Sequence, residues 1–203
     1  MSIKEVLNSP RVYQLFQETG GFFGARLKAI DKLLDIRPGM KVIDIGCGPG
    51  YITKHLPAGI EYIGFDVDPT YIDHARQHFG DKGSFHCRFF DDAAAAEFAG
   101  ADIVMMNGVL HHIPDAELSG TLSSIAKALK PGGILFTLDG VFVEGQSSIA
   151  KTLLKNDRGQ YVRTQEGYEA LLKGAFATVE GHIFHDISLV PYSFFVALSR
   201  KAT

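Results

Sequence analysis

A loop with three glycines, in the stretch KVIDIGCGPGY at residues 41–51, constrains the fold more than any other feature. The apolar run before the glycines is typical of a buried strand. Glycines directly after a parallel strand let the chain turn tightly and bring bare backbone against a ligand. A helix is expected to start near Tyr51, so its amino terminus would point at that ligand. The loop therefore predicts an α/β fold with a ligand at the carboxyl ends of parallel strands.

Beyond residue 40, strand-like and helix-like segments alternate. We expect strands at 41–45, 62–65, 84–89, 103–106 and 134–138, and helices at 51–56, 71–79, 93–98 and 116–129. Asp68 and Asp115 are expected to cap the second and fourth helices, and the Pro-Gly-Gly turn at 131–133 to stop the fourth. Such alternation implies a parallel sheet covered on both faces. Segments 178–184 and 193–198 are expected to form an antiparallel pair that closes one sheet edge.

A length of 203 residues, 46% hydrophobic and 21% charged, fits one globular domain over 1–203. No apolar run approaches the roughly 20 residues of a membrane helix, so we expect no membrane partner. A net charge of −3 lowers the expectation of a nucleic-acid partner. Two cysteines and no recognisable export signal predict a cytoplasmic protein.

We expect three parts within the domain: residues 1–36, a cofactor-binding core at 37–140, and an acceptor-side insertion with the closing strands at 141–203. The first part carries an amphipathic series interrupted by glycines at positions 20, 21 and 24. Tyr13, Phe16, Phe22, Phe23, Leu27, Ile30 and Leu34 make up that series. It is either ordinary packing or a helical lid across the ligand crevice, hinged at the glycines.

Two carboxylates bear on which adenosine-containing cofactor the loop holds. Asp44, inside the first strand, would oppose the pyrophosphate of a dinucleotide but attract the ammonium end of S-adenosylmethionine (SAM). Tyr51 also stands where the dinucleotide fingerprint has its third glycine. Asp66, at the end of the next strand, can accept hydrogen bonds from both ribose hydroxyls. Asp66 therefore indicates adenosine, and Asp44 favours SAM.

Four motifs occur in order across about residues 40–140: VIDIGCGPG, YIGFDVDPTYIDHAR, ADIVMMNGVLHHI and LKPGGILFTLD. This set resembles that of class I SAM-dependent methyltransferases, and most closely a type 11/25-like, small-molecule subgroup. The resemblance implies a Rossmann-like, seven-stranded, mostly parallel sheet with an antiparallel last strand and helices on both faces. It also implies SAM as cofactor and S-adenosylhomocysteine (SAH) as product.

By position, the resemblance assigns the methionine portion of SAM to Gly46, Gly48 and the region of Asp44. Cys47 lies in the same loop, where a small buried side chain is sufficient explanation. The backbone carbonyl of Asn107, at the end of the fourth strand, would help to seat the amino group.

The resemblance assigns the adenosine portion to the ends of the second and third strands. Asp66 would hold the ribose and Val67 would pack on the adenine face. Family members commonly have an acidic residue directly after the third strand, which binds the adenine amino group. Here Phe89 and Phe90 intervene, and the assignment falls on Asp91.

Methyl transfer from a sulfonium is an in-line displacement, so the enzyme mainly aligns the reactants and excludes water. A hydroxyl acceptor also benefits from a base. His111 and His112 after the fourth strand and Asp139 after the fifth are the candidate catalytic residues. The alternative to catalysis is that the histidine pair packs the core or supports the cofactor loop, and that Asp139 belongs to a simple turn. No ligand spacing supports a metal site.

The stretch DRGQYVRTQEGYEALL, residues 157–172, falls where class I methyltransferases often insert acceptor-binding elements. Arg158, Tyr161, Arg163 and Tyr168 are the candidate acceptor-binding residues, able to recognise a carboxylate, phosphate or sugar. The alternative is a solvated loop that leads into a helix capped at Thr164. Together with DGVFVEGQSSIAK, this stretch resembles bacterial methyltransferases associated with surface-polysaccharide or natural-product gene sets.

The leading hypothesis is therefore methyl transfer from SAM to a small or medium-sized acceptor, with a saccharide or a natural-product intermediate as the candidates. The sequence leaves open whether the methylated atom is oxygen, nitrogen or carbon, and it leaves the oligomeric state open. An NAD-dependent reductase is disfavoured by Asp44, by Tyr51 and by the lack of a Tyr-x-x-x-Lys pair. A non-catalytic protein that uses the same crevice as a cofactor sensor is the third possibility.

Overall fold

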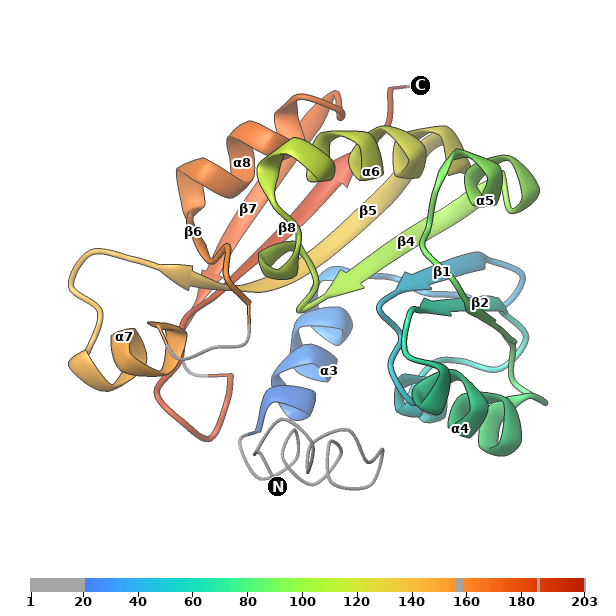
Figure 1. Cartoon of the computed structure of the whole chain (residues 1–203), viewed down its shortest axis with the longest axis horizontal. Coiled ribbons are helices and arrows are strands. Elements are labelled where there is room, and N and C mark those ends of the chain that lie inside the picture. Colours follow the sequence, from blue (N-terminus) through green and yellow to red (C-terminus); the bar gives the residue numbers. More distant parts are fainter. Residues whose placement is uncertain (1–20, 156–158, 186, 203) are drawn as a thin grey trace.

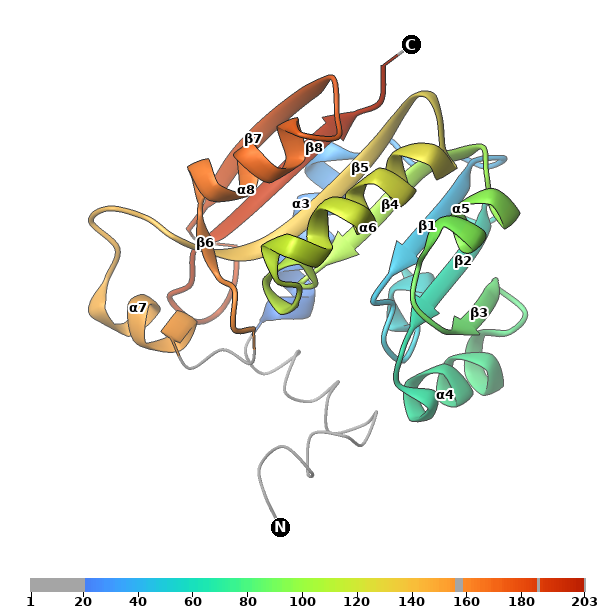
Figure 2. The ribbon, with the colours of Figure 1, turned by 45° about the horizontal axis from the view of Figure 1, so that its top comes forward.

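The computed structural model describes residues 21–155, 159–185 and 187–202. At its centre is a mixed sheet with the strand order β3-β2-β1-β4-β5-β8-β7 (Figures 1 and 2). The strands are β1 (Lys41–Ile45), β2 (Glu61–Asp66), β3 (Ser84–Cys87), β4 (Ala101–Asn107), β5 (Leu129–Phe142), β7 (Thr178–Phe184) and β8 (Phe194–Arg200). A two-residue strand, β6 (Arg163–Thr164), pairs with the end of β5. Only β8 runs antiparallel to its neighbours, which confirms the predicted Rossmann-like sheet and its closing pair.

Helices cover both faces of the sheet. They are α3 (Phe22–Leu33), α4 (Pro69–Phe79), α5 (Asp92–Glu97), α6 (Asp115–Ala128), α7 (Ser148–Lys155) and α8 (Gln165–Lys173), with short 3-10 helices η1 (Tyr51–Lys54) and η2 (Leu110–His112). Helices α5, α6 and α8 lie on one face, and α3 and α4 on the other (Figure 1). Alternate residues of β4 divide between the two cores: Val104 and Met106 face α6, whereas Ile103 and Met105 face α3.

The strand order reverses between β1 and β4. From β1 the chain proceeds outward to β2 and β3, and then returns to β4 and β5 on the other side. Ile45 pairs with Met106, so Gly46 and Asn107 follow at the same edge of the sheet. In open α/β sheets, ligands bind at this kind of switch point. The fold therefore places the glycine loop and the end of β4 side by side.

Helix starts were predicted with mixed success. Asp68 caps α4 as expected, since its side chain accepts from the backbone N–H groups of Thr70 and Tyr71 and Pro69 takes the first helical position. The predicted cap at Asp115 is wrong. Pro114 occupies the cap position of α6, and Asp115 is the first helical residue, with its carboxylate turned to Arg163.

Several boundaries also differ from the sequence prediction. The helix expected at 51–56 is the short 3-10 helix η1, and β3 ends at Cys87, not at residue 89. Helix α6 ends at Ala128, before the Pro-Gly-Gly turn, and β5 begins at Leu129 and incorporates that turn. Gly132, with φ 71°, supplies the left-handed backbone there. Within the described part of the chain, no helix is both long and apolar enough to cross a bilayer.

Candidate active site

The loop after β1 depends on backbone conformations that favour glycine. Gly46, Gly48 and Gly50 have φ values of 75°, 55° and 81°. A Cβ on Gly46 would lie 2.4 Å from Cγ2 of Val109, so this position is closed sterically as well. The backbone N–H groups of Gly46 and Cys47 both donate to the carbonyl of Phe65, at 2.8 and 2.9 Å. These bonds hold the loop against the end of β2.

Asp66 links the glycine loop to the residues after β2. Its Oδ2 accepts from the Gly48 N–H at 2.9 Å, and its Oδ1 accepts from the Asp68 N–H at 2.9 Å. Burial raises the pKa of Asp66, and the backbone N–H donors oppose that shift. Val67 follows with 54% of its surface exposed. The end of β2 thus presents a fixed carboxylate beside an exposed apolar side chain, as a ribose and an adenine ring require.

Asp44 is buried in the centre of the sheet below the loop. Its Oδ2 accepts from the hydroxyl of Tyr62 at 2.8 Å. Burial raises the pKa of Asp44 to about 6, although Tyr62, Arg26 and Asn107 lower it. Oδ1 of Asp44 has no partner at hydrogen-bond geometry among the described residues. A buried acceptor without a donor fits a cationic ligand group at this position.

Cys47 is a packing residue of the loop. It is buried, and its Sγ would lie 2.9 Å from a Cβ added at Gly64 of β2. Burial raises the pKa of its thiol well above the ordinary value. An inert, small side chain is therefore what this position needs.

Arg26 of α3 is a site residue that sequence reasoning missed. Its Nη2 lies 3.4 Å from the backbone carbonyl of Asn107, and its charge lowers the pKa of Asp44. Among the described residues, Nε of Arg26 and both side-chain polar atoms of Asn107 are buried without a partner. A cation inside the apolar face of the first helix was the signal that could have found it. Arg26, Asp44 and the Asn107 carbonyl together fit the carboxylate and ammonium of an amino-acid group.

His111 and Asp139 form a buried pair. Nδ1 of His111 lies 2.7 Å from Oδ1 of Asp139, and the His111 backbone N–H donates to the same oxygen at 3.2 Å. Burial raises the pKa of Asp139, and His111 opposes that shift. His112 is exposed, with its ring centroid 4.3 Å from that of His111. The structure therefore brings two of the three catalytic candidates into direct contact, although Asp139 lies within β5 and not, as was expected, after it or in a turn.

The four candidate acceptor-binding residues lie in different environments. Arg158 lies outside the described residues. Tyr161 is 38% exposed, and its backbone N–H donates to the carbonyl of His111. The Arg163 side chain is largely buried against the chain itself. Tyr168 is 0% exposed and its hydroxyl donates to the carbonyl of Gly140, so it is a core residue and not part of an acceptor-binding surface.

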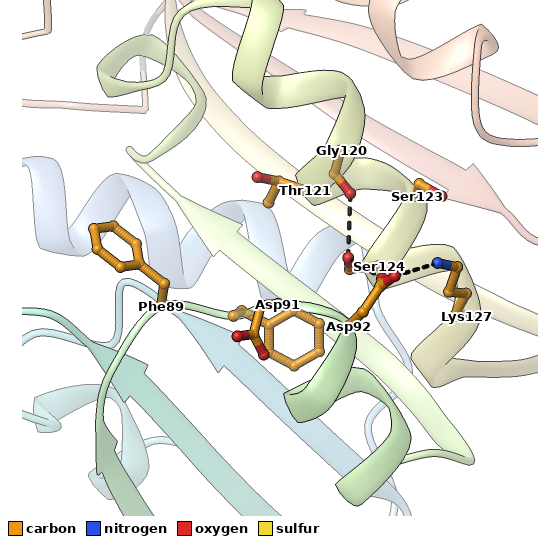
Figure 3. Close-up of a pocket in the computed structure, with 9 residues that line it drawn as sticks. Phe89, Asp91, Asp92, Gly120, Thr121, Ser123, Ser124 and Lys127 are labelled. Carbon is orange, nitrogen blue, oxygen red and sulfur yellow. Dashed lines mark hydrogen bonds and ion pairs between the residues drawn. The ribbon is translucent and has the colours of Figure 1, made fainter.

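Asp91 is the N-cap of α5, where its Oδ1 accepts from the Ala94 N–H at 2.8 Å. It also lies at a surface depression of about 400 Å³ between the residues after β3 and the middle of α6 (Figure 3). Across this depression Asp92 accepts from Ser124 and Lys127, each at 2.6 Å. The polar side chains that cross the depression are therefore paired with one another. Within the described ranges, no three His, Cys, Asp or Glu side chains gather as metal ligands.

A glycine loop after β1, a carboxylate at the end of β2, the reversal at β4 and an antiparallel last strand are the features that the resemblance to class I methyltransferases predicts. Comparisons with known proteins agree. Residues 43–135 match the family model described as a methyltransferase domain. A ubiquinone biosynthesis O-methyltransferase of Aromatoleum aromaticum is 32% identical over 115 residues, which are 55% of this chain and 48% of that protein. The chain thus spans about half the length of this relative.

Solved structures share the fold. Human N-acetylserotonin methyltransferase in complex with SAM has a TM-score of 0.70 and 23% identity, over 100% of this chain and 57% of that one. A TehB-like SAM-dependent methyltransferase of Corynebacterium glutamicum has a TM-score of 0.66 and 20% identity, over 100% of both chains. The match over residues 43–135 and the shared fold together confirm the resemblance to class I SAM-dependent methyltransferases.

Proposed function

We propose that this protein transfers the methyl group of SAM to a small or medium-sized acceptor. The observation that carries the proposal is the convergence of Arg26, Asp44 and the Asn107 carbonyl beside the glycine loop, with Asp66 on the next strand. The positive charge of Arg26 suits the carboxylate of an amino acid, and the negative charge of Asp44 and the Asn107 carbonyl suit its ammonium group. The carboxylate of Asp66 suits the hydroxyls of a ribose. The pyrophosphate of a dinucleotide would be repelled by the carboxylate of Asp44.

SAM supplies a methyl group on a sulfonium that is already activated as a leaving group. We assign the methionine carboxylate to Arg26, the ammonium to Asp44 and the Asn107 carbonyl, and the ribose hydroxyls to Asp66. Val67 packs on adenine, and Asp91 accepts from the adenine amino group. Gly46 and Gly48 let the backbone approach the methionine portion.

In this proposal His111 is the general base. Oδ1 of Asp139 accepts from Nδ1 of His111, which fixes the tautomer and leaves the acceptor proton to Nε2. Both side chains are buried, so the pair is shielded from water. A base of this kind suits a hydroxyl acceptor. Oxygen methylation is therefore the reaction favoured by the site, and a saccharide or natural-product hydroxyl is the acceptor class that we propose.

Helix α3 packs into the core through Ala25, Ala29 and Ile30, as the packing interpretation predicts, and it also borders the proposed site. Arg26 connects this helix to the carbonyl at the end of β4, so the N-terminal part of the chain contributes to the crevice. Gly21 has a φ of 72° at the start of α3, whereas Gly24 lies within the helix and is not a hinge. Tyr13, Phe16 and Gly20 fall outside the described residues.

Isothermal titration calorimetry with SAM, SAH and NADH tests the proposed function. We expect micromolar binding of SAM and SAH and no heat with NADH. Asp66→Ala should weaken SAH binding by about tenfold or more, because hydrogen bonds to a charged group contribute about 1.5–3 kcal/mol. Asp73→Ala, on the exposed side of α4, is the matched control and should bind SAH as the wild type does. Binding of NADH without SAH would refute the proposal.

A further inference from the structure

Residues 159–164 lie directly against the loop that carries His111. The Tyr161 N–H donates to the His111 carbonyl at 3.0 Å. A Cβ on Gly159 would lie 1.7 Å from Cδ2 of His111, so only glycine lets the backbone pass this close to the ring. The insertion after β5 is thereby in contact with both the backbone and the ring of the proposed base.

Arg163 holds the same loop from both ends. Its Nη1 donates to the carbonyls of Leu110 and Tyr161, each at 2.9 Å, and its Nη2 donates to the carbonyl of Ile113 at 2.8 Å. Its Nε donates to Oδ1 of Asp115 at 2.9 Å. The side chain is 9% exposed. A planar guanidinium is the one side chain whose donors reach several fixed acceptors in this way.

The position of Arg163 also ties this contact to Asp139. Arg163 begins β6 and pairs with Val141 of β5, two residues beyond Asp139. The guanidinium lies over the ring of Tyr168 at 5.5 Å, and the Tyr168 hydroxyl donates to the carbonyl of Gly140. One side chain therefore connects the backbone on either side of His111 with the strand that carries its partner.

We propose that Arg163 is a positioning residue that holds His111 and Asp139 at hydrogen-bonding distance, and that it does not bind the acceptor. This inference rests on the proposed role of His111 as base. All five N–H donors of Arg163 are used within the chain, since Nη2 also donates to Oδ1 of Asp115, and this leaves the acceptor to other groups. Without them, the carbonyls of Leu110 and Ile113 lose a charged donor, and the loop gains freedom to move away from β5.

Proton NMR of protein labelled with ¹⁵N-histidine tests the inference without any acceptor. The chain has eight histidines, so the His111 Nδ1–H signal is assigned by its loss in His111→Gln. We expect Arg163→Gln to speed solvent exchange of this proton by about 10- to 100-fold, the range of a lost charge-assisted hydrogen bond. Arg163→Lys keeps the positive charge but lacks the planar set of guanidinium donors, and it should speed the exchange of this proton by a smaller factor. SAH affinity should stay within about twofold of the wild type in both, since the cofactor residues are elsewhere.

Two controls make the experiment decisive. Arg76→Gln removes another arginine that donates to a backbone carbonyl, that of Phe85, and should leave the His111 exchange rate unchanged. Asp115→Asn keeps the carbonyl contacts of Arg163 and should also leave it nearly unchanged. An unchanged rate in Arg163→Lys and Arg163→Gln, or an equal acceleration in Asp115→Asn, would overturn the inference. If Arg163→Gln does not fold, the His111 exchange rates of Arg163→Lys and Asp115→Asn are compared, and faster exchange in Arg163→Lys alone supports the inference. Failure of the wild type to bind SAH would refute the proposed function instead, and leaves the exchange result readable.

Discussion

At the scale of single residues, Asp44 shows how a binding site can lower the stability of the protein that carries it. The pKa of its carboxyl is about 6 in the folded state against an ordinary value of 3.8, mainly because it is buried. A raised pKa means that the folded state holds the proton more tightly than the unfolded state. The contribution of Asp44 to stability is then fully present below about pH 4 and is lost as the pH rises through 6. At pH 7.5 the ionised carboxylate costs up to about 3 kcal/mol, which a cationic ligand would offset.

We therefore expect Asp44→Asn to raise the melting temperature of the ligand-free protein at pH 7.5 and to weaken SAM binding by at least about tenfold. The gain should be up to roughly 6–12 °C, since about 1 kcal/mol corresponds to roughly 2–4 °C in a domain of this size. Calorimetric melting from pH 4 to pH 8 checks this prediction. The difference between variant and wild type should vanish near pH 4 and grow through pH 6. A variant that melts below the wild type at pH 7.5 would contradict the burial argument.

At the scale of elements, the glycine loop and the loop after β4 are built to fit each other. Gly46 lies against Val109, and Gly48 is bonded to Asp66, so the ends of β1, β2 and β4 are joined through backbone and short side chains. A side chain at position 46 would lower stability in two ways. It would clash with Val109, and it would have to adopt a left-handed backbone conformation, which costs about 1–2 kcal/mol.

Gly46→Ala should therefore reduce SAH affinity and stability together. Val109→Ala in the same chain should recover part of the loss, because it removes the methyl group that the new Cβ would meet at 2.4 Å. The double-mutant cycle, measured by urea unfolding and by SAH titration, separates the two effects. Val109→Ala alone is the control. Strict additivity of the two substitutions would show that the clash is not the reason for glycine at this position.

At the scale of the whole molecule, the proposed cofactor site lies at the carboxyl ends of β1, β2 and β4, with Arg26 of α3 beside it. A ligand that contacts β1, β2, β4 and α3 binds only the folded chain, and so it must stabilise the whole domain by mass action. With SAH at about 100 times its dissociation constant, the gain is about 2.7 kcal/mol.

We expect this gain to raise the melting temperature by roughly 5–10 °C for a chain of 203 residues. Differential scanning fluorimetry with SAH, adenosine and NADH is the measurement. SAH should give the full shift, adenosine a smaller one because it lacks the amino-acid group, and NADH none. Equal shifts with adenosine and SAH would mean that Arg26, Asp44 and the Asn107 carbonyl contribute nothing to binding.

The sequence by itself determined the frame of the site. A short apolar run that ends in glycines predicts a strand and a tight turn, and Asp44 and Asp66 lie on consecutive strands whose parallel pairing is implied by the helix predicted between them. The antiparallel closing pair was equally visible, because two strand-like runs lie close together near the end of the chain. These features depend on local propensity and on connection rules.

Only the tertiary structure decided which distant side chains meet. Arg26 and Asn107 are 81 residues apart, Arg163 and Leu110 are 53 apart, and His111 and Asp139 are 28 apart. Their contacts depend on how α3, β6 and the loop after β4 pack on the sheet, and no sequence period records that packing. Tyr168 is a further example, because an aromatic residue in a short polar stretch is as compatible with an acceptor-binding surface as with the core. The structure places it in the core. Long-range packing, and not local preference, selects between the two.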